Sequence, residues 1–224
     1  MFSRIQLKRA VKGGVGFAAV AASAFVRRPA AATACILAYH RVADLGFIDP
    51  DFDDWNVPPA QFERQLIALM DCADIVPLAD ILPRCRGQST GSRPVVALTF
   101  DDGYANFHSQ VLPLLRRYQV PATVFVITSL IGSNGPPPFD PWSKKHGRNL
   151  NPETWRSMNW AELRECAASG LVTIGGHSHE HLMATELSRL ELAKEARVSR
   201  QILMSEFGAI HCYSYPYGSS RLGY

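Results

Sequence analysis

The stretch VVALTFDDG, from Val95 to Gly103, decides the fold class of this 224-residue chain. Its first six residues are almost continuously apolar, as expected of a strand in a parallel sheet whose two faces are both covered. The strand ends in two carboxylates and a glycine, and Gly103 allows a sharp turn beside Asp101 and Asp102. Because Asp-Asp-Gly alone is a common turn, its meaning depends on the segments around it.

Strand and helix patterns alternate on both sides of this stretch, which is the order of βα units built around a parallel sheet. Upstream, residues 35–39 are predicted to form a first strand that ends at His40, and a helix is expected after Pro59. Downstream, the helical spacing of Phe107, Val111, Leu114 and Tyr118 predicts another helix. The other expected elements are strands over 122–128, 172–174 and 211–216, a helix from Asn159 to about Gly170, and a long helix ending at Gly208.

Polar residues follow several of these predicted strands. Asp101 and Asp102 follow the predicted strand over 95–100. His177 follows the strand over 172–174, and Tyr217 follows the strand over 211–216. In β/α barrels the catalytic groups gather at the carboxyl ends of the strands. We therefore expect these side chains, although far apart in sequence, to converge on one rim.

The residue types in these positions suit a divalent metal. His177 and His181 are four residues apart, so one turn of backbone would face both imidazoles the same way, and Asp102 would supply a third ligand. Three such ligands leave an open position for water, whose pKa falls to about 7 when the metal is zinc. Asp101 leaves the turn in another direction and would act as general base. His179 and Glu180, within the second motif, are interpreted as supporting loop residues.

The motifs resemble those of the polysaccharide deacetylase family, the domain shared with chitooligosaccharide deacetylases. The resemblance covers roughly residues 36–218, with the motifs in the family's order. It implies an α/β fold, an incomplete (β/α) barrel with fewer strands than eight, and a hydrolase that removes acetyl groups from N-acetylated polysaccharides. The segments that carry it are Thr99–Tyr104, His177–His181 and Tyr215–Gly218, together with the strand-like residues 36–42 and 122–126.

The resemblance also implies a role for each site residue. Asp101 would be the base, and Asp102, His177 and His181 would bind the metal, most often Zn2+, with Co2+ or Ni2+ as alternatives. The backbone N–H of Tyr217 would stabilise the oxyanion of the tetrahedral intermediate. Contacts with the N-acetylated polysaccharide are expected from His40, Pro216, Tyr217 and Trp142.

Two positions depart from the family pattern. Ser214 stands where many relatives have an arginine that orients the base, and Tyr-Pro-Tyr-Gly without that arginine resembles the exopolysaccharide branch that acts on poly-N-acetylglucosamine. A Leu-x-His motif, which carries the general acid in relatives, does not follow Gly218. The sequence is therefore expected to be a C-terminally truncated domain whose barrel lacks its last strands.

Residues 132–151 are predicted to form a long loop, and a loop of this length in a compact domain is usually functional or disordered. It holds Phe139 and Trp142. Their aromatic faces would either stack on sugar rings or pack onto the barrel surface, and both alternatives stay open.

The composition is that of an ordinary globular domain, with 47% hydrophobic and 19% charged residues. The net charge of +3 gives no basic surface suited to nucleic acid. The five cysteines form no C-x-x-C pair, so we expect reduced, mostly buried thiols rather than a disulfide framework or a cysteine zinc site.

The first residues have a separate character. Residues 1–34 are predicted to be a basic and apolar leader, and residues 35–224 the deacetylase domain. The apolar run within residues 1–28 is shorter than the roughly 20 residues that cross a bilayer. It is interpreted as a weak signal sequence, as a helix that lies weakly on an anionic membrane face, or as a frayed leader. The expected compartment is the cell envelope, membrane-peripheral or exported.

Three functions remain open at this point. The first is metal-dependent N-deacetylation of an envelope or extracellular polysaccharide. An O-acetyl carbohydrate esterase would use the same metal and base on an alcohol leaving group. A truncated, inactive remnant would still bind metal or glycan.

Overall fold

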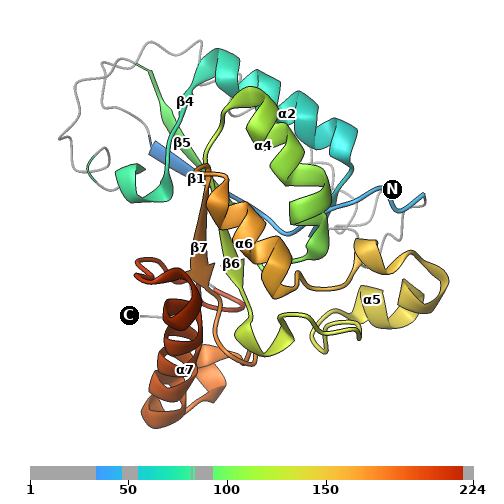
Figure 1. The fold of residues 1–224 in the computed structure, drawn as a ribbon, viewed down its shortest axis with the longest axis vertical. Coiled ribbons are helices and arrows are strands. Elements are labelled where there is room, and N and C mark those ends of the chain that lie inside the picture. The colour runs from blue at the N-terminus through green and yellow to red at the C-terminus, as the bar shows by residue number, and fades with distance from the viewer. Residues whose placement is uncertain (1–33, 47–54, 82, 84–92, 219–224) are drawn as a thin grey trace, which may run out of the picture. The chain divides into compact units, whose positions relative to one another are not determined.

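The computed structural model describes residues 34–46, 55–81, 83 and 93–218. Parallel strands form the main sheet of this part of the chain (Figure 1), and two further short strands form a separate parallel pair. The main sheet has the order β1 (Ala34–Tyr39), β5 (Val95–Phe100), β6 (Ala122–Val126) and β7 (Val172–Gly176), with β4 (Asp74–Ile75) also paired to β5. The separate pair is β2 (Arg41–Val42) with β3 (Asn56–Val57).

The central strand is β5, whose six residues are all buried. Its parallel register with β1 places Tyr39 beside Phe100, and β6 and β7 pair Val126 with Gly176. The carboxyl ends of these strands therefore share one rim of the sheet. Within the described residues the sheet is open, with β1 at an edge. This architecture confirms the predicted α/β fold of the incomplete-barrel type.

Helices cover the face of the sheet to which Val96, Leu98 and Phe100 of β5 point. Figure 1 shows α2, α4 and α6 side by side, and residues from each of them belong to one core cluster with β5, β6 and β7. The helices are α2 (Pro59–Cys72), α4 (Leu112–Tyr118), α5 (Pro141–His146), α6 (Trp160–Ala168) and α7 (Arg189–Phe207).

Local sequence explains where these helices begin. Pro59 occupies the first turn of α2, where its missing N–H costs nothing. Asn159 and Glu162 form the predicted capping box of α6, each accepting the other's backbone N–H. Ser188 and Glu191 form a second capping box at the start of α7.

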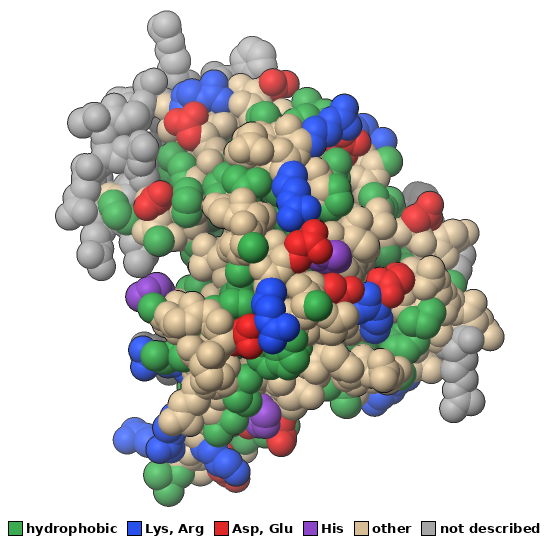
Figure 2. All heavy atoms as spheres, in the orientation of Figure 1, with side chains coloured by type: hydrophobic (Ala, Val, Ile, Leu, Met, Phe, Trp, Pro, Cys, Tyr) green, Lys and Arg blue, Asp and Glu red, His purple; other side chains and the backbone are tan. Residues whose placement is uncertain are grey.

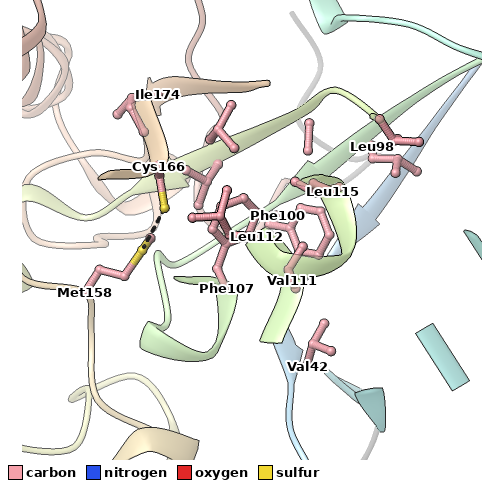
Figure 3. Packing of buried hydrophobic residues seen from close by; sticks show 14 of the residues in the cluster. Val42, Leu98, Phe100, Phe107, Val111, Leu112, Leu115, Met158, Cys166 and Ile174 are labelled. Carbon is pink, nitrogen blue, oxygen red and sulfur yellow. Dashed lines mark hydrogen bonds between the residues drawn. The ribbon is translucent and has the colours of Figure 1, made fainter. Parts of the chain in front are cut away.

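The core is mainly aliphatic and also contains buried aromatic and sulfur-containing side chains (Figure 3). Phe100 of β5 meets Phe107 edge to face, with 4.9 Å between ring centroids. Cys166 of α6 lies 4.0 Å from the sulfur of Met158, and both residues are buried. These contacts fix α6 and the segment after β5 against the sheet, which sets the rim on which the polar residues lie.

The predicted buried face of the helix after β5 is confirmed at Phe107 and Val111, which are buried, but it does not continue unchanged beyond them. Residues Phe107–Val111 form a π-helix, and α4 begins only at Leu112. A π turn holds one more residue than an α turn, so the buried face of the helix moves to different sequence positions after Val111. As a result Leu112 and Leu115 are buried in α4, whereas the predicted Leu114 and Tyr118 are only partly buried.

Two other predicted elements also differ. Residues 211–216, predicted as a strand, form only an isolated parallel bridge between Tyr213 and Gly176. The pairing ends there because the chain turns at residues 216–217 and Pro216 has no N–H to donate. Residues 132–151, predicted as a loop, contain α5, whose first turn is capped by the Asp140 side chain.

The four cysteines among the described residues are free, but the prediction that most cysteines are buried is wrong. Cys166 is buried, whereas Cys35 on the edge strand and Cys72 at the end of α2 are exposed. Cys85 and the predicted leader, apart from Ala34, lie outside the described residues. Among the described helices, none combines the length and apolar character needed to cross a membrane. Acidic and basic side chains are interspersed on the face drawn in Figure 2.

Candidate active site

Three side chains from two distant segments meet at the rim of the sheet. The Nε2 atom of His177 lies 3.4 Å from Oδ1 of Asp102, and Nε2 of His181 lies 3.3 Å from the same oxygen. One ligand-type atom from each residue lies within 4.8 Å of the others, and all three residues are buried. The structure therefore brings together the three residues that the sequence indicated as metal ligands.

The backbone at this site adopts a conformation that residues other than glycine rarely take. Asp102, Ser178, His181 and Tyr217 have φ values of 70°, 65°, 61° and 56°. Such left-handed residues cost of order 1–3 kcal/mol each and persist where the surrounding structure fixes them, often at functional sites. Each of the three polar motifs thus contains at least one turn that aims side chains rather than continuing a helix or strand.

Two glycines allow the motifs to pack this closely. Gly103 has a φ of 68°, and a Cβ atom there would lie 2.9 Å from Cγ1 of Val126. Gly175 does not need an unusual φ, but a Cβ atom there would lie 2.5 Å from Cδ1 of Phe125. Glycine at these two positions therefore brings the acidic turn and the strand that precedes His177 into contact with β6.

His177 is oriented by a hydrogen bond from its other ring nitrogen. Nδ1 lies 2.9 Å from the backbone oxygen of Ser214. A carbonyl oxygen can only accept, so Nδ1 carries the proton and Nε2 presents a lone pair toward Asp102. Ser214, the position where relatives often have arginine, thus contributes its backbone oxygen to the site.

His181 is held in a different way. Its Nδ1 atom is buried and has no hydrogen-bond partner among the described residues. The imidazole instead stacks on Phe139, with 3.9 Å between ring centroids, and meets Tyr217 edge to face at 4.7 Å. The backbone N–H of His181 donates to Oγ of Ser178, which closes the turn.

The two carboxylates have opposite electrostatic environments. Burial raises the pKa of Asp102, but the imidazoles of His177 and His181 beside its carboxylate outweigh this effect and bring the pKa well below its usual range. Burial raises the pKa of Asp101, and the charges of His177 and His40 only partly oppose the shift. Asp102 is thus held ionised, whereas Asp101 is the more basic carboxylate.

These residues fit a divalent cation. The donor set is one carboxylate oxygen and two imidazole nitrogens, which is a known zinc ligand set that leaves a coordination position open. Oδ1 of Asp102 is buried without a hydrogen bond, and so is Oδ1 of Asp101. Buried carboxylate oxygens without a partner are costly, and a cation between them and the imidazoles would remove that cost.

A buried glutamate that the sequence did not reveal supports the second histidine motif. Oε2 of Glu195, on α7, accepts hydrogen bonds from the backbone N–H groups of His179 at 2.9 Å and Glu180 at 2.8 Å. His179 also has its Nδ1 atom 3.0 Å from Oγ1 of Thr128. The predicted supporting loop is therefore held from two sides. In the sequence, the only sign of this role is that Glu195 shares a helical face with Ser199 and Leu203, the other buried residues of α7.

Replacing Glu195 with alanine is expected to destabilise the fold. Two backbone N–H groups would lose a charged acceptor in part-buried hydrogen bonds, and each such loss costs about 1–3 kcal/mol. Urea unfolding followed by circular dichroism should show this decrease in the free energy of unfolding. Arg200→Ala, at an exposed position on the same helix, is the control and should change the unfolding free energy by less than about 0.5 kcal/mol. An equally small change in Glu195→Ala would contradict the supporting role.

The residues predicted to contact substrate are placed differently from one another. His40 follows β1 beside Asp101, whose backbone N–H donates to the oxygen of Tyr39 at 2.8 Å. Tyr217 is 48% exposed beside His181. Trp142 is 1% exposed, so the prediction that it stacks on a sugar is wrong, because its ring packs against the guanidinium of Arg41. Pro216 is also buried, and its ring lies in the turn rather than on the surface.

An exposed aromatic residue that no sequence pattern indicated also lies at this rim. Trp55 is 61% exposed, and its ring lies 4.5 Å from the imidazole of His40. By comparison, Trp142 and Trp155 are buried. Trp55 is isolated between polar residues in the sequence, so no periodic pattern marked it.

Known proteins share both the sequence motifs and the fold. Residues 88–222 match the polysaccharide deacetylase family. A poly-β-1,6-N-acetyl-D-glucosamine N-deacetylase of Staphylococcus aureus (strain MSSA476) is 27% identical over 186 residues, which cover 78% of this chain and 58% of that protein. The protein of the same name from Escherichia coli (strain K12) is 33% identical over 103 residues, covering 46% of this chain and 14% of that one. The chain thus spans little more than half the length of the Staphylococcus relative.

Solved structures agree at the level of the fold. IcaB from Ammonifex degensii superposes with a TM-score of 0.66 at 22% identity, covering 84% of this chain and 76% of that one. The Streptococcus pyogenes deacetylase PplD superposes with a TM-score of 0.63 at 21% identity, covering 82% and 73%. Together with the family match over more than half of its length, these findings show that the chain belongs to the polysaccharide deacetylase family.

Proposed function

We propose that this chain is a metal-dependent hydrolase that removes N-acetyl groups from an envelope or extracellular polysaccharide built of N-acetylglucosamine. The observation that carries the proposal is the buried cluster of Asp102, His177 and His181, with Asp101 directly before Asp102 in the chain. Support for the substrate class comes from relatives that are named poly-β-1,6-N-acetyl-D-glucosamine N-deacetylase.

The proposed mechanism assigns each residue a task that suits its position. Asp102, His177 and His181 would hold a divalent metal, most often zinc, which supplies Lewis-acid activation of water and of the acetyl carbonyl. Asp101, directly before the ligand Asp102 in the chain, accepts the proton of the attacking water. The backbone N–H of Tyr217 stabilises the developing oxyanion, and His40 lines the substrate side of the rim.

An assay that compares leaving groups tests the proposal. The purified chain is given β-1,6-linked N-acetylglucosamine oligomers or O-acetylated sugars, and acetate release is measured. Release from the N-acetylated oligomers at a higher kcat/KM supports the proposed activity. Faster release from the O-acetylated sugars would instead make the chain an esterase with the same base and metal ligands.

Trp55 is expected to contribute to substrate binding. Its exposed ring beside His40 offers an aromatic face to a sugar ring. If stacking contributes about 0.5–1.5 kcal/mol, Trp55→Ala should raise KM about 2- to 10-fold with little change in kcat. Leu190→Ala, at a residue that is 83% exposed on α7, is the control and should leave KM unchanged. The same KM in both variants would contradict the role of Trp55.

A further inference from the structure

A buried polar cluster, away from the ligands themselves, links the segments that build the site. Arg41 is 2% exposed and follows His40, and its Nη2 atom donates to Oδ2 of Asp140 and, at 3.1 Å, to Oγ of Ser143. Tyr104, which follows the acidic turn, donates from its hydroxyl group to Oδ2 of Asp140 at 2.9 Å. Asp140 thus joins the segment after β1, the turn after β5 and the start of α5.

The carboxylate of Asp140 is fixed through both of its oxygens. Oδ1 accepts the backbone N–H of Ser143 at 3.0 Å, and Oδ2 accepts from three side chains. The guanidinium of Arg41 lies over the rings of Trp142 and Tyr104, 4.4 Å and 4.8 Å from their centroids. A buried ion pair with this many hydrogen bonds defines one position for the backbone at Asp140.

Phe139 immediately precedes this fixed residue, and its ring covers one face of the imidazole of His181. His177 has a hydrogen bond from Nδ1 that sets its ring orientation, but His181 has none from its Nδ1 atom among the described residues. The stack with Phe139 is instead the contact that orients the imidazole ring of His181. A ligand imidazole that is free to rotate would lose rotational entropy on binding metal, and the stack reduces that loss.

We propose that Phe139 is a positioning residue for His181, and that the buried Arg41–Asp140 pair holds Phe139 in place. The inference rests on the metal site of the proposed function. It accounts for a buried carboxylate, Asp140, in a segment that the sequence predicted to be a loop, and for its pairing with Arg41 of β2. It also gives the aromatic residue of this loop a role toward the metal ligand rather than toward a sugar.

The first test measures zinc affinity by competition with a chromophoric chelator, for the wild type and for Phe139→Leu. An aromatic pair stabilises by an amount that corresponds to about a 2- to 10-fold change in affinity. We therefore expect the affinity for zinc to fall by about this factor in Phe139→Leu. Phe139→Tyr keeps the ring and should retain wild-type affinity. Phe207→Leu, which disrupts a ring pair with Trp160 at 6.3 Å on the outer helices, is the matched control and should also bind as the wild type does.

A second measurement needs neither metal nor activity. In the metal-free protein, the Phe139 ring current should shift the ring protons of His181 in the NMR spectrum, and Phe139→Leu should remove that shift. Asp140→Asn should reduce it while Phe139 is still present. Asp140→Asn leaves the buried Arg41 without its partner, which is destabilising. A thermal unfolding curve is therefore recorded to show that this variant is folded.

The Arg41–Asp140 part of the proposal is tested by a double-mutant cycle. If Asp140 acts through Phe139, the Phe139→Leu/Asp140→Asn double variant should bind zinc no more weakly than the weaker single variant. Additive losses would overturn that part. An unchanged affinity in Phe139→Leu would overturn the positioning role alone, whereas a wild type that binds no zinc would overturn the proposed function and this inference with it.

Discussion

Asp101→Asn is expected to lower kcat/KM for deacetylation by about 10²–10⁴-fold, the usual contribution of a general base. Asparagine has the shape of aspartate but cannot accept the proton of water at neutral pH. The effect should appear in kcat, because Asp101 is proposed to act on the reacting water rather than to hold the sugar. Acetate release from N-acetylglucosamine oligomers, measured at saturating zinc, gives both constants.

Zinc affinity separates this role from that of a metal ligand. Asp101→Asn should bind zinc within a few-fold of the wild type, since the three proposed ligands remain in place. Asp71→Asn, at an exposed position on α2, controls for the change of charge and should retain full activity. Deacetylation at the wild-type rate by Asp101→Asn would remove Asp101 from the mechanism.

His177→Ala is expected to weaken zinc binding by more than 100-fold and to abolish deacetylation. Loss of a residue that merely supports a ligand typically costs 10–100-fold in affinity, so loss of the ligand itself should cost more. The substitution also leaves the carbonyl of Ser214 without the ring that donates to it. Equilibrium dialysis against zinc, followed by measurement of bound metal, gives the stoichiometry and the affinity.

His108 provides the matched histidine. It lies on the surface, where its Nε2 atom is 2.9 Å from Glu165, and His108→Ala should change neither zinc binding nor activity. Circular dichroism of both variants shows whether each is folded. A folded His177→Ala variant that still binds one zinc with wild-type affinity would contradict the assignment of the ligands.

Much of the fold could be predicted because the relevant signals are local. The apolar run Val95–Phe100, the capping box at Asn159 and the helix stop at Gly208 depend on neighbours in the sequence, and the structure has each element at that place. The convergence of Asp102, His177 and His181 followed from the strand ends before them. Parallel strands place those ends on one rim whatever the loops between them do.

The remaining features depend on tertiary contacts or on hydrogen-bond choices that no short pattern records. The π turn at Phe107–Val111 shifts the helical face by one residue, which the spacing of apolar residues could not show. Glu195 and Arg41 look like surface charges in the sequence, yet both are buried by partners from other segments. The sequence could not decide between the two alternatives for Trp142 for the same reason, because its partner Arg41 is about a hundred residues away in the chain.

The most direct test of the central claim is the metal dependence of acetate release from β-1,6-linked N-acetylglucosamine oligomers. The chain is stripped of metal with a chelator, and zinc is then added back in steps up to one equivalent. We expect no release from the stripped protein, release that rises in proportion to zinc bound, and little release from Asp101→Asn at full zinc occupancy. Release that persists without metal, or a fully loaded wild type that releases none, would contradict it.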